Sequence, residues 1–430
     1  MSVRFGPGPL RGALRLPPDK SISHRAALIA AMADGVTEIA GYLDSADTRS
    51  TLDAVRRLGA AVEGIGAAGS GARISVSGAG LRGAAEARVD VGNAGTLLRL
   101  LPGWLAGQET GSWRIDGDDS IRRRPVDRVA DPLRLMGARV RCREDRLPPL
   151  EIEGAPLHGI EYELPVASAQ VKSCLLLAGL LAEGETRVVE PLPSRDHTER
   201  MLAAAGAEVE RADGAVSVRA AERLEPGAIV VPGDFSSAAF FLVAALLAPG
   251  SDVLLEGVGL NPTRTGLLAA LGRMGAAIEV DEEDARGGEP VGRLRARSCE
   301  LVATEVSGAE VPLAIDELPL IALAACFAEG TTRIRDAAEL RRKESDRIAT
   351  VAAALRALGG RVEPTGDGME IEGGGLRGGS VSAAGDHRVA MLAAVAGAAS
   401  EQGVEVEGME AAAVSYPGFE ADLASLRKEA

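Results

Sequence analysis

The chain has 430 residues, of which 46% are hydrophobic and 3% are aromatic. This length suits two or three domains of ~100–200 residues, and cores built from small aliphatic side chains favour a regular α/β architecture. The formal net charge of −15 argues against a nucleic-acid partner, because binding to nucleic-acid phosphates needs a surplus of Lys and Arg. If the ligand is a small anion, the basic residues that bind it must be gathered locally.

The four cysteines are widely spaced and form no CxxC or Cys/His pattern of the kind that binds metal ions. The N-terminal segment carries neither an apolar signal core nor a transit-peptide composition. No apolar run reaches the ~20 residues of a membrane helix. We therefore expect a cytoplasmic protein with reduced thiols, no metal site and no membrane partner.

One sequence pattern recurs six times, although its last copy is degenerate. A helix ends near a glycine, a short β-branched strand and a loop follow, and a second helix usually ends in LGA or a similar triplet. The copies open at Gly35, Gly107, Gly184, Gly250, Gly330 and Gly403. Strands are expected after the closing triplets, for example at Ala61–Glu63, Arg139–Arg141 and Glu208–Glu210. A composition break at Val230–Phe240 then predicts two domains of three copies each, in an enzyme or in a repeat scaffold.

The first candidate site lies where a proline-bounded segment enters an apolar helix, in PPDKSISHRAALIAAMADG. Lys20, Ser21 and Arg25 stand near the helix start, where free backbone N–H groups and the helix dipole favour an anion. An ordinary capped helix with solvated charges is the alternative. We expect His24 of the same motif to be structural.

A glycine-rich turn, VGNAGTLLRL, provides the second candidate. Gly92 and Gly95 let the backbone approach a ligand closely. The nearby run Arg122–Arg124 suits bidentate binding of a carboxylate or phosphate. A solvated loop is the alternative.

Two further motifs place a serine beside an amide or a guanidinium at the start of a helix. Ser168 and Gln170 begin the apolar helix of PVASAQVKSCLLLAGL, and Ser194 and Arg195 precede the helix of PSRDHTERML. Helix capping explains each serine singly. Their recurrence at equivalent points of successive repeats favours ligand binding.

Three motifs of the second half, IDELPLIALAACFAEG, LRRKESDRIATVAAALRALGG and GDHRVAMLAAVAG, place carboxylates at helix starts, and the last two add cations beside them. In the second of them, we expect Lys343 and Arg347 four residues apart on one face of a single helix, beside Glu344. A salt-bridged exposed turn is the alternative. The other two motifs contribute Asp316, Glu317, Asp386, His387 and Arg388.

Taken in order, the segments DKSISHR, GNAGT, RRRP, SAQVKS, SRDHTE, IDELP, KESDR and GDHR resemble the 5-enolpyruvylshikimate-3-phosphate synthase family, over Pro17–Phe419. The resemblance implies an α/β fold of two similar domains, each of three βαβαββ-type repeats in an inside-out α/β barrel, with the active site in the interdomain cleft. One domain would combine residues 1–19 with 236–430, and the other, 20–235, would be inserted between them.

The implied reaction transfers the enolpyruvyl group of phosphoenolpyruvate to the 5-hydroxyl of shikimate 3-phosphate, in the shikimate pathway to chorismate and the aromatic amino acids. The resemblance implies no cofactor, inhibition by glyphosate, and no partners beyond the two small-molecule substrates, so we expect a monomer. Local Arg and Lys residues can neutralise the anionic substrates without a metal ion.

The resemblance also assigns the site residues. The catalytic group consists of Asp316 near the reacting hydroxyl, Glu344 as the proton carrier at the methylene, and Lys20. Shikimate 3-phosphate would bind to Lys20, Ser21, Arg25, Ser168, Gln170, Ser194, Arg195, Asp316 and Lys343. Phosphoenolpyruvate would bind to Lys20, Gly95, Arg124, Gln170, Arg347 and Arg388.

Three positions depart from the family pattern. Ala169 stands where many relatives have a second serine, and we expect Arg195 to supply the missing phosphate contact. Glu339 and Val414 replace an asparagine and a lysine of some relatives, so the corresponding contacts are not carried over.

Two other enzymes remain as alternatives. The enolpyruvyl transferase that acts on UDP-N-acetylglucosamine shares the fold, but it typically has a reactive cysteine in the loop that corresponds to Gly117–Pro125, where this chain has none. An RNA-end-processing enzyme of related fold fits poorly with the acidic composition.

Overall fold

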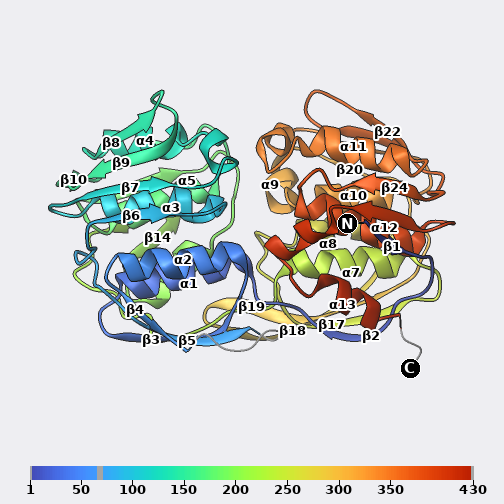
Figure 1. Ribbon diagram of the computed structural model, residues 1–430, viewed down its shortest axis with the longest axis horizontal. Coiled ribbons are helices and arrows are strands. Elements are labelled where there is room, and N and C mark those ends of the chain that lie inside the picture. The colour runs from blue at the N-terminus through green and yellow to red at the C-terminus, as the bar shows by residue number, and fades with distance from the viewer. Residues whose placement is uncertain (1, 65–70, 428–430) are drawn as a thin grey trace. The chain divides into compact units, whose positions relative to one another are not determined.

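The computed structural model describes residues 2–64 and 71–427 and divides into two compact units. Unit 2 contains the described residues of Pro18–Val231 together with Ala285–Glu289. Unit 1 contains the described residues before Pro18, Pro232–Asp284, and the described residues from Pro290 onward. The chain therefore leaves unit 1 early, forms unit 2 and returns (Figure 1).

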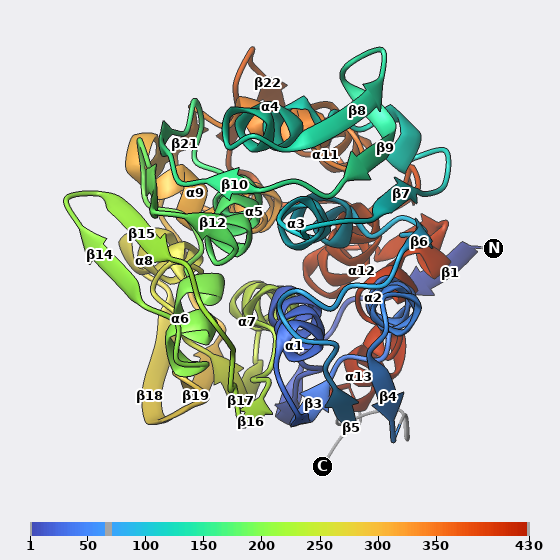
Figure 2. The ribbon, with the colours of Figure 1, turned by 90° about the vertical axis from the view of Figure 1, so that its left-hand side faces the viewer.

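Three helices form the core of unit 2: α1 (Lys20–Met32), α3 (Gly95–Ala106) and α5 (Ala169–Gly179). Figure 2 shows them end-on, with the sheets of this unit outside them. Nearly all their residues after the first turn are buried, because small aliphatic side chains let helices approach closely on several sides. At Gly103 of α3, for example, a Cβ atom would lie 2.1 Å from the backbone oxygen of Cys174 in α5.

The three main sheets of unit 2 share one topology, in which an edge strand runs parallel to its neighbour and the other pairings are antiparallel. Their strand orders are β16–β3–β5–β4, β6–β7–β9–β8 and β11–β13–β15–β14. The bounds are β3 Val36–Tyr42, β4 Ala61–Glu63, β5 Ala72–Ser77, β6 Ala87–Asp90, β7 Ser112–Asp116, β8 Arg139–Arg143, β9 Leu147–Glu153, β11 Glu161–Glu163, β13 Glu185–Val189, β14 Val209–Ala212, β15 Ala215–Arg219 and β16 Ala228–Val230. A short pair, β10 (Leu157–His158) and β12 (Ala182–Glu183), and the helices α2 (Ala46–Arg57), α4 (Asp127–Leu135), α6 (His197–Ala204) and η1 (Ile121–Arg123) complete the unit.

Unit 1 repeats this plan around the core helices α7 (Phe235–Leu247), α10 (Leu318–Ala325) and α12 (His387–Ala399). Its sheets have the orders β18–β19–β17–β2, β20–β21–β23–β22 and β1–β25–β24. The strand bounds are β1 Ser2–Phe5, β2 Arg11–Arg15, β17 Asp252–Gly259, β18 Ala277–Arg286, β19 Glu289–Arg297, β20 Glu305–Val306, β21 Thr331–Ile334, β22 Arg361–Pro364, β23 Met369–Glu372, β24 Gly379–Ser382 and β25 Val404–Glu407. The remaining helices are α8 Gly266–Arg273, α9 Val311–Ala314, α11 Arg347–Ala357, α13 Phe419–Ser425, η2 Gly308–Glu310, η3 Ala338–Arg342 and η4 Met409–Val414.

The six-fold repeat and the α/β fold class predicted from the sequence are confirmed. Each core helix ends shortly before a predicted glycine, and all but the last copy continue into a second helix that ends at the predicted triplet. The last copy is degenerate: its sheet has three strands, and η4 and α13 follow it. The expected strands Ala61–Glu63 and Arg139–Arg141 are present, whereas the third begins one residue later, at Val209.

The single helix expected over Leu340–Gly360 is wrong. The chain forms η3, leaves helical geometry at Lys343, and begins α11 at Arg347. The Asp346 side chain ends this break, because it accepts a hydrogen bond from the Ala349 N–H (3.1 Å) as the N-cap of α11. Lys343 and Glu344 therefore do not share a helical face with Arg347.

The described residues contain no helix long and apolar enough to cross a membrane. All four cysteines are free thiols, and those at 174 and 326 are buried.

Candidate functional site

Unit 1 brings its five predicted site residues into one group around Arg347. This side chain is 1% exposed and binds three carboxylates: Asp386 through Nε (2.9 Å), Asp316 through Nη1 (3.3 Å) and Glu344 through Nη2 (2.5 Å). Burial alone would lower the pKa of Arg347, but these carboxylates raise it above its ordinary value. Arg347 therefore stays charged and holds the surrounding acids in place.

Asp316 is the point where the cations of this group meet. Its carboxylate lies 3.5 Å from Lys343 Nζ, 3.3 Å from Arg347 and 3.7 Å from Arg388. Arg388 also donates a hydrogen bond to the backbone oxygen of Asp316 (3.0 Å). Asp316 lies two residues before α10, whose N-cap is Glu317.

Asp386 connects the group to α12. Its fully buried carboxylate caps this helix by accepting from the Arg388 N–H (2.9 Å), and it also accepts from the Ser345 hydroxyl (2.9 Å). Burial alone would raise the pKa of Asp386, but the charge and hydrogen bond of Arg347 lower it below its usual value. Asp386 of the motif GDHR thus caps α12 and neutralises the charge of Arg347.

Arg388 also belongs to a buried chain of polar contacts that the sequence did not predict. Arg264 donates to Ser236 (2.6 Å), Ser236 donates to Glu317, and Glu317 lies 3.6 Å from Arg388. These three residues are at least 96% buried. Glu317 stood out in the motif IDELP, but no sequence spacing links it to Ser236 or Arg264.

In unit 2, the start of α3 lies against Arg124. A Cβ atom placed at Gly95 would lie 2.7 Å from Arg124 Nη1, so the missing side chain leaves room for this guanidinium. Gln170 of α5 donates to the hydroxyl of Thr96 (3.2 Å). The structure thus brings together the predicted residues of the glycine-rich turn, the arginine run and the SAQVKS motif.

Arg25 joins three helices of unit 2. Its guanidinium donates to Thr198 of α6 (2.8 Å), to Ser173 of α5 (3.0 Å) and to the backbone oxygen of Ser21 (3.0 Å). Lys20, at the start of the same helix, forms an ion pair with Asp47 of α2 (2.9 Å). Both cations are therefore held at defined positions.

His24 is buried between these cations. Its Nδ1 lies 2.6 Å from the Thr51 hydroxyl, and burial lowers its pKa to about 4. The ring is therefore neutral at neutral pH. This environment agrees with the structural role expected for His24.

The remaining predicted residues of unit 2 lie at helix starts. Ser168 caps α5 by accepting from the Val171 N–H (3.5 Å), and Arg195 lies half-buried before α6. Ser194 donates its hydroxyl proton to Glu190, which also binds the buried Lys172 (2.7 Å). A lysine inside the otherwise apolar α5 was a signal in the sequence that could have identified this group.

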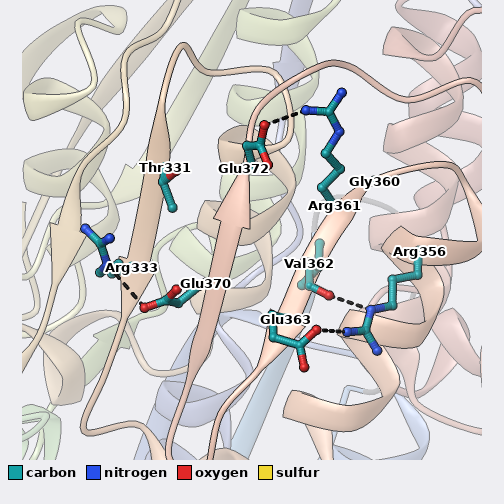
Figure 3. Close-up of a pocket in the computed structure, with 9 residues that line it drawn as sticks. All are labelled: Thr331, Arg333, Arg356, Gly360, Arg361, Val362, Glu363, Glu370 and Glu372. Carbon is teal, nitrogen blue, oxygen red and sulfur yellow. Dashed lines mark hydrogen bonds and ion pairs between the residues drawn. The ribbon is translucent and has the colours of Figure 1, made fainter.

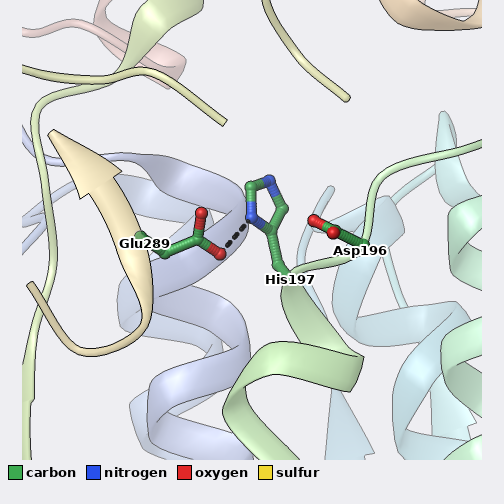
Figure 4. Close-up of side chains that lie close together, drawn as sticks. All are labelled: Asp196, His197 and Glu289. Carbon is green, nitrogen blue, oxygen red and sulfur yellow. Dashed lines mark hydrogen bonds and ion pairs between the residues drawn. The ribbon is translucent and has the colours of Figure 1, made fainter. Parts of the chain in front are cut away.

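Asp196, His197 and Glu289 are the one cluster of three residues in the described part of the chain whose types and spacing could hold a metal ion (Figure 4). His197 Nδ1 lies 2.8 Å from Glu289. Asp196, however, already binds the guanidinium groups of Arg200 (2.9 Å) and Arg211 (2.8 Å). Two cations on one carboxylate disfavour a metal ion there, and the cluster serves instead to fix the start of α6.

A pocket in unit 1, lined mainly by β21, β22 and β23, lies away from these groups in sequence and contains none of the predicted site residues (Figure 3). Each of its guanidiniums has a glutamate partner, as in the pair of Arg333 with Glu370 (3.2 Å). Exposed pairs of this kind contribute only ~0–1 kcal/mol each. We regard this surface as a row of solvated ion pairs rather than as a binding site for an anion.

Comparison with known proteins identifies close relatives. The family model "EPSP synthase (3-phosphoshikimate 1-carboxyvinyltransferase)" matches residues 5–423. The 3-phosphoshikimate 1-carboxyvinyltransferase of Thermus thermophilus is 51% identical over 99% of both chains, and that of Bacillus licheniformis is 47% identical over 98% of both.

Solved structures give the same result. The EPSP synthase of Acinetobacter baumannii is similar with a TM-score of 0.87 and 43% identity, over 99% of this chain and 97% of that one. The enolpyruvyl transferase NikO of Streptomyces tendae has a TM-score of 0.78 over the same shares of the two chains, at 19% identity. The second likeness supports the fold alone.

We expect Asp386→Asn to lower the free energy of unfolding by about 3–5 kcal/mol at neutral pH, because it removes the fully buried one of the three carboxylates that pair with the buried Arg347 charge. Arg347 lowers the folded-state pKa of Asp386, so this contribution is present above the unfolded-state pKa of ~3.9 and is lost as the pH falls through the folded-state pKa. Chemical denaturation from pH 7 to pH 3 measures the free energy of unfolding of the wild type and of Asp386→Asn. The difference between these two free energies should become smaller below about pH 4.

Asp252, whose side chain is 38% exposed and pairs with Arg295 (2.7 Å), supplies the control. Asp252→Asn should cost only ~0–1 kcal/mol at neutral pH. Equal losses from the two substitutions would contradict a special role for the buried pair.

Proposed function

Because the chain belongs to the EPSP synthase family, we propose that it transfers the enolpyruvyl group of phosphoenolpyruvate to the 5-hydroxyl of shikimate 3-phosphate. The observation that carries this proposal is the match to 3-phosphoshikimate 1-carboxyvinyltransferases, which reaches about half identical residues over nearly the whole chain. The protein is accordingly a transferase, placed in the shikimate pathway of aromatic amino-acid biosynthesis.

The rival reaction with UDP-N-acetylglucosamine is disfavoured. The relatives at about 50% identity carry the shikimate enzyme's name, and the loop Gly117–Pro125 has no cysteine. Cys142, beyond that loop, lies on β8, and burial raises its pKa to about 11. A reactive thiol needs the opposite shift. The same relatives count against an RNA-end-processing enzyme.

We assign the anionic groups of the substrates to the cations described above. The three-helix junction at Arg25, with Ser21, Ser168, Ser194 and Arg195, suits the phosphate of shikimate 3-phosphate, since hydroxyls and a guanidinium all donate to phosphate oxygens. Arg124, whose guanidinium lies where a side chain at position 95 would be, suits phosphoenolpyruvate. Lys20, Gln170, Lys343, Arg347 and Arg388 complete the two sets.

The acid–base roles fall to Asp316 and Glu344. The hydroxyl oxygen attacks the central carbon of phosphoenolpyruvate while its methylene carbon takes a proton; phosphate then leaves and the new methyl group loses a proton. Asp316 takes the hydroxyl proton, and Glu344 delivers and removes the proton at the methylene carbon, with Lys20 assisting. Supporting this pairing, Arg347 binds both carboxylates and thereby fixes the base and the acid together.

These side chains suffice to neutralise the substrates, so the proposed reaction includes no metal ion and no cofactor. We propose further that the protein acts as a monomer in the cytoplasm and that glyphosate competes for the phosphoenolpyruvate site.

An assay of phosphate release tests the function directly. With phosphoenolpyruvate present, the purified protein should release phosphate when shikimate 3-phosphate is added and not when UDP-N-acetylglucosamine is added. Release only with the second acceptor would overturn the assignment.

Asp316→Asn and Glu344→Gln should each lower kcat by about 100–10,000-fold, because each removes a proton transfer while nearly keeping the shape of the side chain. The dissociation constants of both substrates should change much less, as measured by calorimetry. The exposed Glu401→Gln serves as the control and should keep normal turnover. Near-normal kcat in either site variant would remove that residue from the acid–base pair.

Gly95→Ala should raise KM for phosphoenolpyruvate, because the new methyl group would lie 2.7 Å from Arg124 Nη1 and would displace this guanidinium. Loss of the guanidinium's hydrogen bonds to a charged ligand costs about 1–3 kcal/mol, which corresponds to a roughly 5–150-fold change. KM for shikimate 3-phosphate should change little, and inhibition by glyphosate should weaken. Steady-state kinetics with each substrate varied in turn measures these effects.

Gly272→Ala is the matched control, since a Cβ atom at this position of α8 would meet nothing within 4 Å. It should leave all kinetic constants unchanged. An unaltered KM for phosphoenolpyruvate in Gly95→Ala would place Gly95 outside the binding site.

A further inference from the structure

The residues Asp196–Glu199 directly follow Ser194 and Arg195, and all four are buried although all four are polar. Each contacts a different part of unit 2. Their partners are Arg200 and Arg211 for Asp196, Glu289 for His197, Arg25 and Ser173 for Thr198, and Lys172 for Glu199. Buried polar groups need partners, so these contacts fix the start of α6 and with it the Ser194–Arg195 turn.

Lys172 is the most deeply enclosed cation of this arrangement. It is 1% exposed, and its Nζ lies 2.7 Å from Glu190 and 2.6 Å from Glu199. An isolated buried charge is costly, and an ion pair in the interior is rarely a gain over apolar packing. A lysine at this position of the apolar α5 therefore calls for a reason other than stability.

The reason lies in Glu190, which Lys172 shares with Ser194. The Ser194 hydroxyl donates its hydrogen bond to Oε1 of Glu190, while Lys172 binds Oε2. A serine has one hydroxyl proton, and phosphate oxygens without a proton can only accept. Ser194 can therefore donate to a phosphate group only by turning its hydroxyl away from Glu190.

We propose that Lys172 is a positioning residue for the binding of shikimate 3-phosphate. It keeps the Glu190 carboxylate paired when the Ser194 hydroxyl turns to the substrate's phosphate, and it offsets the negative charge of Glu190 beside that phosphate. This inference rests on the proposed function, which places Ser194 at the phosphate group.

The test compares the KM values of the two substrates in Lys172→Met, which keeps the length of the side chain and removes its charge. KM for shikimate 3-phosphate should rise about tenfold, because Glu190 without its cation holds Ser194 and repels the phosphate. KM for phosphoenolpyruvate should change less than about twofold, since its assigned residues have other partners. Equal changes for both substrates would show a merely structural role and would overturn the proposal.

The double variant Lys172→Met/Glu190→Gln differs from Lys172→Met only in the charge of Glu190, because Glu199 has lost Lys172 in both proteins. Once the carboxylate is also neutral, KM for shikimate 3-phosphate should return to within about threefold of the wild-type value. Additive losses in the double variant would contradict the proposal.

Glu190→Gln alone keeps the proposal testable if Lys172→Met does not fold. This substitution keeps the Lys172–Glu199 pair. It should leave KM for shikimate 3-phosphate unchanged or lower it. A tenfold increase of this KM would show that Glu190 itself supports phosphate binding and would overturn the proposal. The same assay measures turnover of shikimate 3-phosphate by the wild-type protein. No turnover by the wild type would contradict the proposed function, whereas normal wild-type turnover with equal KM changes in Lys172→Met would contradict only this inference.

Discussion

The core helices of both units are buried along almost their whole length, and this burial decides where polar chemistry can occur. The helix α7 is buried at every residue, and α1, α5 and α12 are buried almost throughout after their first turns. Sheets cover these helices from outside, as Figure 2 shows for unit 2. Charged residues are excluded from this interior, and the predicted site residues lie at or before the starts of core helices or of the outer helices α4, α6 and α11.

Charged groups at these helix starts require counter-charges, and the pairing gives the site its order. In unit 1, Arg347 and Asp386 are both almost fully buried, and the pair positions the carboxylates proposed for proton transfer. Each of these groups has more than one partner, so its side chain is held in one orientation. Such preorganisation lowers the cost of arranging charges during a reaction. The carboxylates proposed for proton transfer in unit 1 therefore need little rearrangement of their own.

Local sequence patterns predicted the elements well and the contacts between them poorly. Helix ends follow from glycines and periodic apolar residues, so the six copies were found from the sequence alone. The break before α11 was missed because the cap at Asp346 resembles an ordinary helical aspartate. The contacts of Lys172 with Glu190, and of Arg264 with Ser236, join residues that are 18 and 28 positions apart. Which residues pair at such separations depends on how the elements pack, and no short sequence pattern encodes that packing.

The strand β1 has a consequence for the synthesis of the chain. It is made before unit 2, but its partner in the sheet, β25, lies some four hundred residues later and completes the last sheet of unit 1. The helices and main sheets of unit 2, by contrast, come from one continuous segment that ends at Val231. Domains generally fold as units during synthesis, with the earlier ones first. The helices and main sheets of unit 2 can therefore form on the ribosome, while β1 keeps an unpaired edge until β25 has been made.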